Sequence, residues 1–178
     1  MTHLPAIIST LRARGIDHAL IGAIAMSVHG VARATCDVDL LIVDPRGLEE
    51  ATWGDLRAAG AELEIRRGDA DDPLAGVVRI DPEGERPVDV IAGKAAWQRE
   101  ILERSSHAAT IDDVAIPAVG AADLILLKLY AGGTQDRWDI EELLATGEQG
   151  SLIHAVEERV ATLPMDSRQL WERLRGES

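Results

Sequence analysis

The chain has 178 residues, a formal net charge of −13 and a hydrophobic content of 46%. This length suits one domain with a small extension, and the hydrophobic content is enough for an ordinary core. Because the chain has no Phe and one Tyr, that core must be aliphatic. The negative charge argues against a protein that coats nucleic acid through a broad basic face, although a local basic pocket remains compatible with it.

The single cysteine, Cys36, excludes a disulfide framework within the chain. A reducing cytoplasm fits this cysteine usage. Residues 1–5 lack a basic leader followed by an apolar stretch, so we expect no signal peptide. No apolar run approaches the roughly 20 residues of a membrane span. We therefore expect a cytoplasmic protein with no membrane partner.

Helix and strand patterns alternate in the first part of the chain. Apolar residues recur at helical spacing over residues 4–14 and stop at Gly15, a common C-terminal signal of helices. Further helices are predicted over 23–29, 46–59 and 95–104. Strands are predicted over 18–21, 37–43, 61–66, 77–81 and 86–91, and a short strand pair over 108–116 that turns at Asp112 and Asp113.

The strand patterns end after Pro117, and four helices are predicted, over 121–131, 135–145, 151–161 and 166–175. The sequence therefore predicts an α/β (α+β) fold. Its α/β core covers residues 1–117, and a C-terminal helical part over 118–178 packs on that core.

Two carboxylates on one strand are the first sign of chemistry. Asp37 and Asp39 stand two apart in the apolar run over 37–43, and residues two apart on a strand point to the same face. Two adjacent carboxylates repel each other, so one stays protonated unless a cation lies between them. Mg²⁺ prefers oxygen ligands and usually also binds substrate phosphates. The pair therefore indicates a metal site for phosphoryl or nucleotidyl transfer.

Two further features could complete such a site. Gly22 and Ala23 form a small-residue turn between a strand and a helix, where a backbone can approach a phosphate. Asp89 lies within an apolar strand, where an ionisable residue is costly unless it is paired or ligated. A third carboxylate has a use in a two-metal site, where it can ligate one ion and act as base for the incoming hydroxyl.

Two basic residues also stand where they could contact a bound nucleotide. Arg33 and Thr35 come directly before the acid pair, and Lys128 lies on the first C-terminal helix. Cations beside a triphosphate would neutralise its charge and favour the departure of pyrophosphate. Taken singly, Arg33 and Lys128 are more often surface residues.

Each acid also has an ordinary structural alternative. Asp37 could cap a turn, and Asp39 could lie at a sheet edge. Residues 82–85 are a good hairpin connector between the strands over 77–81 and 86–91, so Asp89 could pair with Arg79 across this hairpin. The functional interpretation depends on the joint occurrence of these residues, in order and on suitable elements.

The arrangement of Gly22-Ala23, a thirteen-residue spacer, Asp37-Val38-Asp39 and a later Asp89 resembles the DNA polymerase β-type nucleotidyltransferases. Residues 19–39 and 123–131 are similar to the stand-alone bacterial nucleotidyltransferases grouped with the AbiEii toxins. The resemblance covers residues 16–145. Ala23 departs from it, because the family usually has Gly or Ser at this position.

The resemblance implies an αβαβ core with a small mixed sheet, two Mg²⁺ ions and a nucleoside triphosphate as substrate. It implies transfer of a nucleoside monophosphate to an acceptor hydroxyl. Lys128, Asp136 and Asp139 match the C-terminal positions that complete the family's site. The predicted catalytic residues are Asp37, Asp39, Asp89 and Lys128, with the three aspartates as metal ligands; the predicted nucleotide-binding residues are Gly22, Ala23, Arg33, Thr35, Asp136 and Asp139.

The acceptor stays open among several classes. The AbiEii resemblance implies a toxin that modifies tRNA or protein and has a cognate antitoxin. The alternative is a small molecule such as an aminoglycoside, which the acidity of the chain and its size favour. A third possibility is a non-catalytic member that binds a nucleotide or a partner, which Ala23 and the pair Gly132-Gly133, where many relatives carry a basic residue, would favour.

Overall fold

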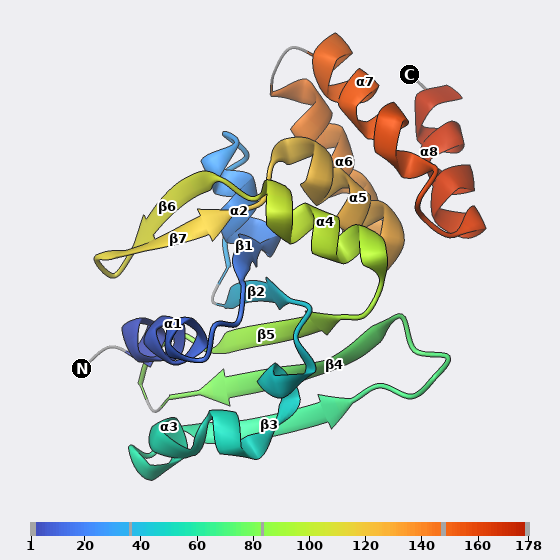
Figure 1. The fold of residues 1–178 in the computed structure, drawn as a ribbon. Coiled ribbons are helices and arrows are strands. Elements are labelled where there is room, and N and C mark those ends of the chain that lie inside the picture. The colour runs from blue at the N-terminus through green and yellow to red at the C-terminus, as the bar shows by residue number, and fades with distance from the viewer. Residues whose placement is uncertain (1–2, 36, 83, 147–148, 177–178) are drawn as a thin grey trace.

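The computed structural model describes residues 3–35, 37–82, 84–146 and 149–176, so Cys36 lies outside the described residues. The described strands are β1 (Ala19–Ile21), β2 (Val38–Ile42), β3 (Glu62–Arg67), β4 (Leu74–Asp81), β5 (Val88–Gly93), β6 (His107–Ile111) and β7 (Val114–Ala118). They form one mixed sheet in the order β3-β4-β5-β2-β1-β7-β6 (Figure 1). The β2–β5 and β1–β7 pairs are parallel, and the other neighbours are antiparallel.

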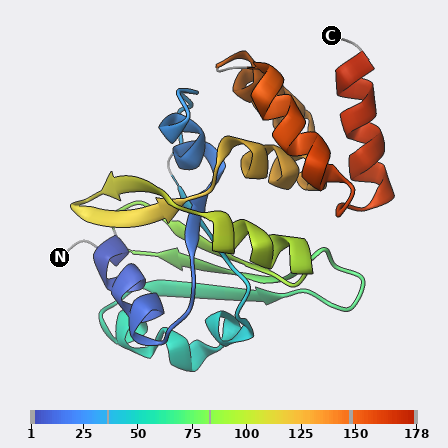
Figure 2. The ribbon, with the colours of Figure 1, turned by 45° about the horizontal axis from the view of Figure 1, so that its top comes forward.

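Helices pack around the sheet, and the last four of them follow the final strand in the chain. They are α1 (His3–Ala13), α2 (Gly22–Val28), α3 (Gly54–Ala58), α4 (Ala96–Arg104), α5 (Ala121–Ala131), α6 (Thr134–Ala145), α7 (Gln149–Val160) and α8 (Met165–Gly176). Helices α5 to α8 gather on one side of the molecule, away from α1 and α3 (Figures 1 and 2). No helix among the described residues is both long and apolar enough to cross a bilayer.

The core is mainly aliphatic, as the composition requires. Side chains of α1, the central strands and α5 fill it, and Ile7, Leu20 and Leu40 are fully buried. Trp53 is also fully buried, and its indole N–H donates to the carbonyl of Gly47 at 2.9 Å. An aromatic side chain therefore enters the core with its polar atom satisfied.

The α/β fold class with a mixed sheet and C-terminal helices is confirmed. The strand pair predicted over 108–116 is also present, and Asp112 and Asp113 have φ values of 48° and 62° at its turn. Positive φ at both central residues is typical of the tightest hairpins. The division of the chain at residue 117 stays a prediction.

The single helix predicted over 46–59 is wrong. Two 3₁₀ turns, Pro45–Leu48 and Glu50–Thr52, come before the short α3. The hydroxyl of Thr52 donates to the carbonyl of Arg46 at 2.6 Å, just as the indole of Trp53 uses the carbonyl of Gly47. Side chains thus occupy carbonyls that a continuous helix would need for its own N–H groups.

Candidate active site

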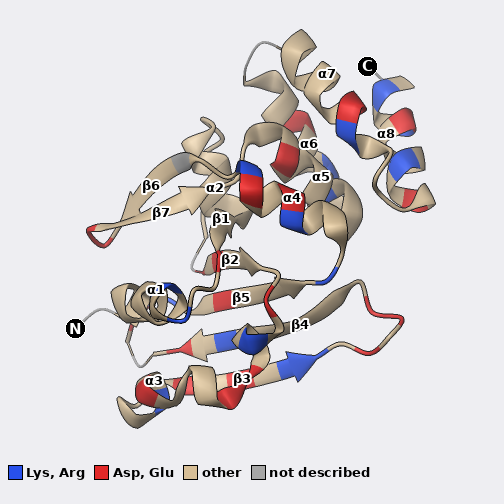
Figure 3. Ribbon diagram, in the orientation of Figure 1, with Lys and Arg blue, Asp and Glu red and all other residues tan. Residues whose placement is uncertain are grey.

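The predicted acids lie in one row across the centre of the sheet. In the strand registers, Ile21 on β1 is opposite Asp39 on β2, and Asp39 is opposite Asp89 on β5. The row continues to β4, where Asp89 is opposite Arg79. Asp37 comes directly before β2. Acidic and basic positions therefore adjoin on neighbouring strands (Figure 3).

Gly22 lets the turn between β1 and α2 approach Asp39. Its φ is +64°, in the region that favours glycine, and a Cβ built on it would overlap the Asp39 carboxylate. The following Ala23 is buried, at the start of the seven-residue α2. The small-residue turn that the sequence indicates is present, and the side chain it accommodates is an acid.

Burial and mutual repulsion make Asp39 hard to ionise. Burial, with the charges of Asp89 and Asp37, raises the pKa of Asp39 to about 6, and the charges of Lys128 and Arg33 partly oppose this rise. Burial likewise raises the pKa of Asp89, against the influence of Arg79. The row therefore carries more negative charge than its own surroundings compensate.

Arg79 is the side chain that partly compensates the acids. Its Nη1 donates to both carboxylate oxygens of Asp89, at 2.9 and 3.2 Å. The same nitrogen lies 3.6 Å from Oδ2 of Asp37. The structural alternative considered for Asp89, a pairing with Arg79, is therefore present. Asp37 lies near the same guanidinium. The hairpin register between β4 and β5 was the sequence signal for this contact.

Lys128 and Arg33 meet on the buried Asp139. Lys128 Nζ lies 2.9 Å from Asp136 and 2.6 Å from Asp139, and Arg33 Nη1 lies 2.8 Å from Asp139. The side chain of Asp139 has no exposed surface and also accepts a hydrogen bond from Gln135. Four residues predicted for the site therefore form one network, which joins α5 and α6 to the segment between α2 and β2. Sequence reasoning missed Gln135, which no motif marks.

Thr35 has a local role in the structure. Its hydroxyl donates to the carbonyl of Asp37 and accepts from the Asp37 N–H, both at 3.2 Å. These bonds shape the chain where it enters β2. These contacts position Asp37, and the nucleotide-binding role of Thr35 stays a prediction.

A pocket opens beside the third acid. It has a volume of about 380 Å³ and is lined by Glu64, Arg66, Val77, Arg79 and Asp89. Its walls belong to β3, β4 and β5, so it lies on the far side of Asp89 from Asp39 in strand order. No sequence pattern indicates this pocket, because strand pairing brings its residues together.

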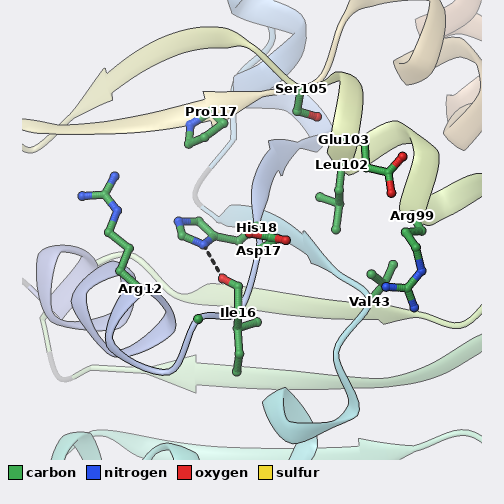
Figure 4. A pocket seen from close by; sticks show the side chains of 11 residues that line it. Arg12, Ile16, Asp17, His18, Val43, Arg99, Leu102, Glu103, Ser105 and Pro117 are labelled. Atoms are coloured by element: carbon green, nitrogen blue, oxygen red, sulfur yellow. Dashed lines mark hydrogen bonds between the residues drawn. The ribbon is translucent and has the colours of Figure 1, made fainter.

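A second cavity, of about 550 Å³, lies at the other end of the central strands. Its lining includes His18 before β1 and Val43 after β2, and none of the predicted site residues (Figure 4). The His18 ring nitrogen Nδ1 bonds the carbonyl of Ile16 at 3.0 Å, and burial lowers the pKa of His18. The larger cavity is therefore separate from the acidic row.

The donor chemistry of the row fits Mg²⁺. Asp37, Asp39 and Asp89 offer only carboxylate oxygens, which this ion prefers, and their repulsion calls for a cation. As the side chains lie, no three acidic, His or Cys residues in the described ranges are grouped to hold a metal ion. Two of the three acids are instead in contact with Arg79.

Comparisons with known proteins bear on the fold. No protein-family model matches the chain, and no curated protein matches it in sequence. Among solved structures, the antibiotic-resistance factor ANT(2'')-Ia matches with a TM-score of 0.57 and 16% identity, over 98% of this chain and 94% of that one. The chain has the DNA polymerase β-type nucleotidyltransferase fold.

Two further structures agree with this nucleotidyltransferase fold. ANT(2'')-Ia in complex with adenylyl-2''-tobramycin matches with a TM-score of 0.55 and 10% identity, over 89% of this chain and 95% of that one. The lincosamide antibiotic adenylyltransferase LnuA, with lincomycin bound, matches with a TM-score of 0.51 and 14% identity, over 82% of this chain and 96% of that one. Identities this low relate the folds alone.

Proposed function

We propose that the chain is a metal-dependent nucleotidyltransferase that moves a nucleoside monophosphate from a nucleoside triphosphate to a hydroxyl of a small molecule. The observation that carries this proposal is the row of Asp39 and Asp89, with Asp37 beside it, on adjacent central strands of a nucleotidyltransferase fold. Two half-buried acids opposite each other cost stability, and binding of a divalent cation between them would offset that cost.

In this proposal Asp37, Asp39 and Asp89 hold Mg²⁺. The ion, when bound, supplies charge stabilisation at the transferred phosphoryl group and at the leaving pyrophosphate. Asp89, which lines the pocket, accepts the proton of the acceptor hydroxyl. The hydroxyl oxygen then forms the new bond to phosphorus as the bond to pyrophosphate breaks.

Positive charge on the helical side supports the triphosphate in this proposal. Lys128 and Arg33 already influence the charge state of Asp39, so they lie within electrostatic reach of a nucleotide held there. Asp136 and Asp139 orient these two cations rather than contact an anionic nucleotide themselves. The roles of Gly22 and Ala23 at the phosphates stay predictions.

A small acceptor is favoured by the pocket beside Asp89. Its volume of about 380 Å³ lies within the range of small-molecule sites. The solved structures similar to this chain include transferases named for antibiotics, over nearly their full length. The net charge of −13 would also attract a cationic acceptor such as an aminoglycoside.

The toxin interpretation ranks second. Its support is the resemblance of residues 19–39 and 123–131 to AbiEii-type sequences, which implies tRNA or protein as acceptor and a cognate antitoxin. A net charge of −13 would repel the phosphate backbone of tRNA. A small-molecule acceptor accounts for both the charge and the pocket.

Label transfer tests the proposal. The protein is incubated with Mg²⁺ and each of the four α-labelled nucleoside triphosphates, with aminoglycosides, lincosamides, bulk tRNA or cell protein as acceptor. We expect label on a small molecule, and a loss of about 100-fold or more in Asp39→Asn, as for removal of a group that stabilises the transition state.

A matched variant makes this test specific. Asp81→Asn changes charge by the same amount at the exposed end of β4, outside the acidic row, and should transfer label as wild type does. Label on tRNA or protein alone would favour the toxin interpretation. Metal-dependent nucleotide binding without transfer to any acceptor would favour the non-catalytic one.

A further inference from the structure

We propose that Arg79 is a positioning residue that holds Asp37 and Asp89 in the absence of metal and releases both carboxylates when a divalent cation binds. Metal affinity is then set partly by competition with this guanidinium. The inference rests on the proposed function, because the carboxylates that Arg79 holds are the predicted metal ligands.

The contacts of Arg79 define its position. One nitrogen, Nη1, lies 2.9 Å from Oδ2 of Asp89 and 3.6 Å from Oδ2 of Asp37. Strand register fixes this arrangement, since Arg79 and Asp89 are direct partners in the β4–β5 ladder. A single cationic group therefore bridges Asp89 on β5 and Asp37, which comes directly before β2.

A metal ion would need the same oxygen atoms. Mg²⁺ binds carboxylate oxygens at about 2.0–2.1 Å and carries two charges, so a guanidinium on the same oxygens of Asp89 would repel the ion and compete with it. Arg79 has room to move, because 36% of its side chain is exposed and the pocket of about 380 Å³ lies beside it.

Lys128 and Arg33, which also lie near the row, form ion pairs with other acids. The ion pairs of Lys128 go to Asp136 and Asp139, and that of Arg33 goes to Asp139. Both are therefore held by α6, whereas Arg79 is held by the predicted metal ligands themselves. This difference singles out Arg79 as the group that metal must displace.

Metal binding without nucleotide tests the inference. Mn²⁺ is titrated into the nucleotide-free protein, and free Mn²⁺ is followed by electron paramagnetic resonance. We expect Arg79→Met to bind Mn²⁺ about tenfold more tightly than wild type, the low end of the effect that a neighbouring Arg has on a carboxylate. An affinity that is unchanged or weaker in Arg79→Met would overturn the inference.

Arg66→Met is the matched control. Arg66 lines the same pocket and pairs with Glu64 at 2.7 Å, so its loss removes the same charge without freeing a predicted ligand. Its Mn²⁺ affinity should stay within about twofold of wild type, because exposed charges interact weakly. An equal gain in both variants would show a general charge effect and overturn the specific role of Arg79.

Two further measurements separate positioning from a structural role. In EDTA, Arg79→Met should unfold at a lower temperature than wild type, and saturating Mn²⁺ should remove the difference. A deficit of equal size with and without metal would overturn the inference.

If Arg79→Met does not fold, Arg79→Lys takes its place in the titration. Lysine keeps the charge but bridges two carboxylates less well, so the Mn²⁺ affinity of Arg79→Lys should exceed that of wild type by a few fold.

The outcomes also separate this inference from the proposed function. Wild-type binding of Mn²⁺ that is lost in Asp39→Asn would support the metal site whatever Arg79→Met does. Equal affinities in wild type and Arg79→Met would then overturn the role of Arg79 alone. Absence of binding in both would overturn the inference alone, because the proposed function is tested separately by label transfer with metal and nucleotide present.

Discussion

Gly22 and Asp39 show how closely two residues of this site depend on each other. The φ of Gly22 is +64°, and a Cβ built there would meet the Asp39 carboxylate. Asp39 in turn is half-buried opposite another acid. Any side chain at position 22 would therefore move the carboxylate at the centre of the row. The glycine is required by packing against Asp39, independently of any phosphate.

Gly22→Ala should cost both stability and metal binding. We expect a loss of roughly 2–4 kcal/mol in the free energy of urea unfolding, from the positive φ and the overlap with Asp39 together. Gly15→Ala is a matched control, because Gly15 has the same φ of +64° and nothing within 4 Å of its Cβ position. It should cost only about 1 kcal/mol, and equal losses in the two variants would contradict a close contact with Asp39.

At the scale of the elements, helices α5 and α6 are tied to the segment before β2 through one buried carboxylate. Asp139 has no exposed side-chain surface and receives Lys128, Arg33 and Gln135. A buried charge with several partners is stable only while those partners remain. The helical part therefore depends for its docking on the same residues that we propose assist the nucleotide.

Lys128→Met should destabilise the protein by about 3 kcal/mol, because it leaves Asp139 with less compensation in a buried position. The double variant Lys128→Met/Asp139→Asn should lose less than the sum of the single losses. A double-mutant cycle by urea unfolding measures this coupling. Arg137→Met, an exposed position on α6, controls for loss of charge on the helix. Additive losses would show that the 2.6 Å pair contributes no coupling energy.

The elements also show what sequence patterns can and cannot predict. Strand β2, which begins directly after Asp37 and contains Asp39, was predictable, because alternation and apolar runs are local. The contact of Asp89 with Arg79 was open to prediction, since a hairpin connector sets the register. The meeting of Lys128 with Asp139 followed from family resemblance alone. The prediction of one helix over 46–59 was wrong because the side chains of Thr52 and Trp53 donate to backbone carbonyls. Hydrophobic periodicity contains no information on such bonds.

At the scale of the whole molecule, strand order decides the site. β2 lies between β1 and β5, although β3 and β4 separate β2 from β5 in the chain. This order places Asp39 opposite Asp89 and adds the pocket walls of β3 and β4. Pairing between distant strands has no local signature, so the sequence could supply the acids but neither their alignment nor the pocket.

The net charge of the whole chain should govern how a cationic acceptor arrives. With a charge of −13, the protein attracts cations from solution, and salt screens this attraction. For a polycationic acceptor, kcat/KM should fall by roughly tenfold as ionic strength rises from about 0.02 to 0.2 M. The triphosphate is kept saturating, so that its own repulsion from the acidic chain does not enter. A neutral hydroxylated acceptor should show little change, and a polycationic acceptor with the same flat profile would show that the charge lies too far from the pocket to steer the substrate.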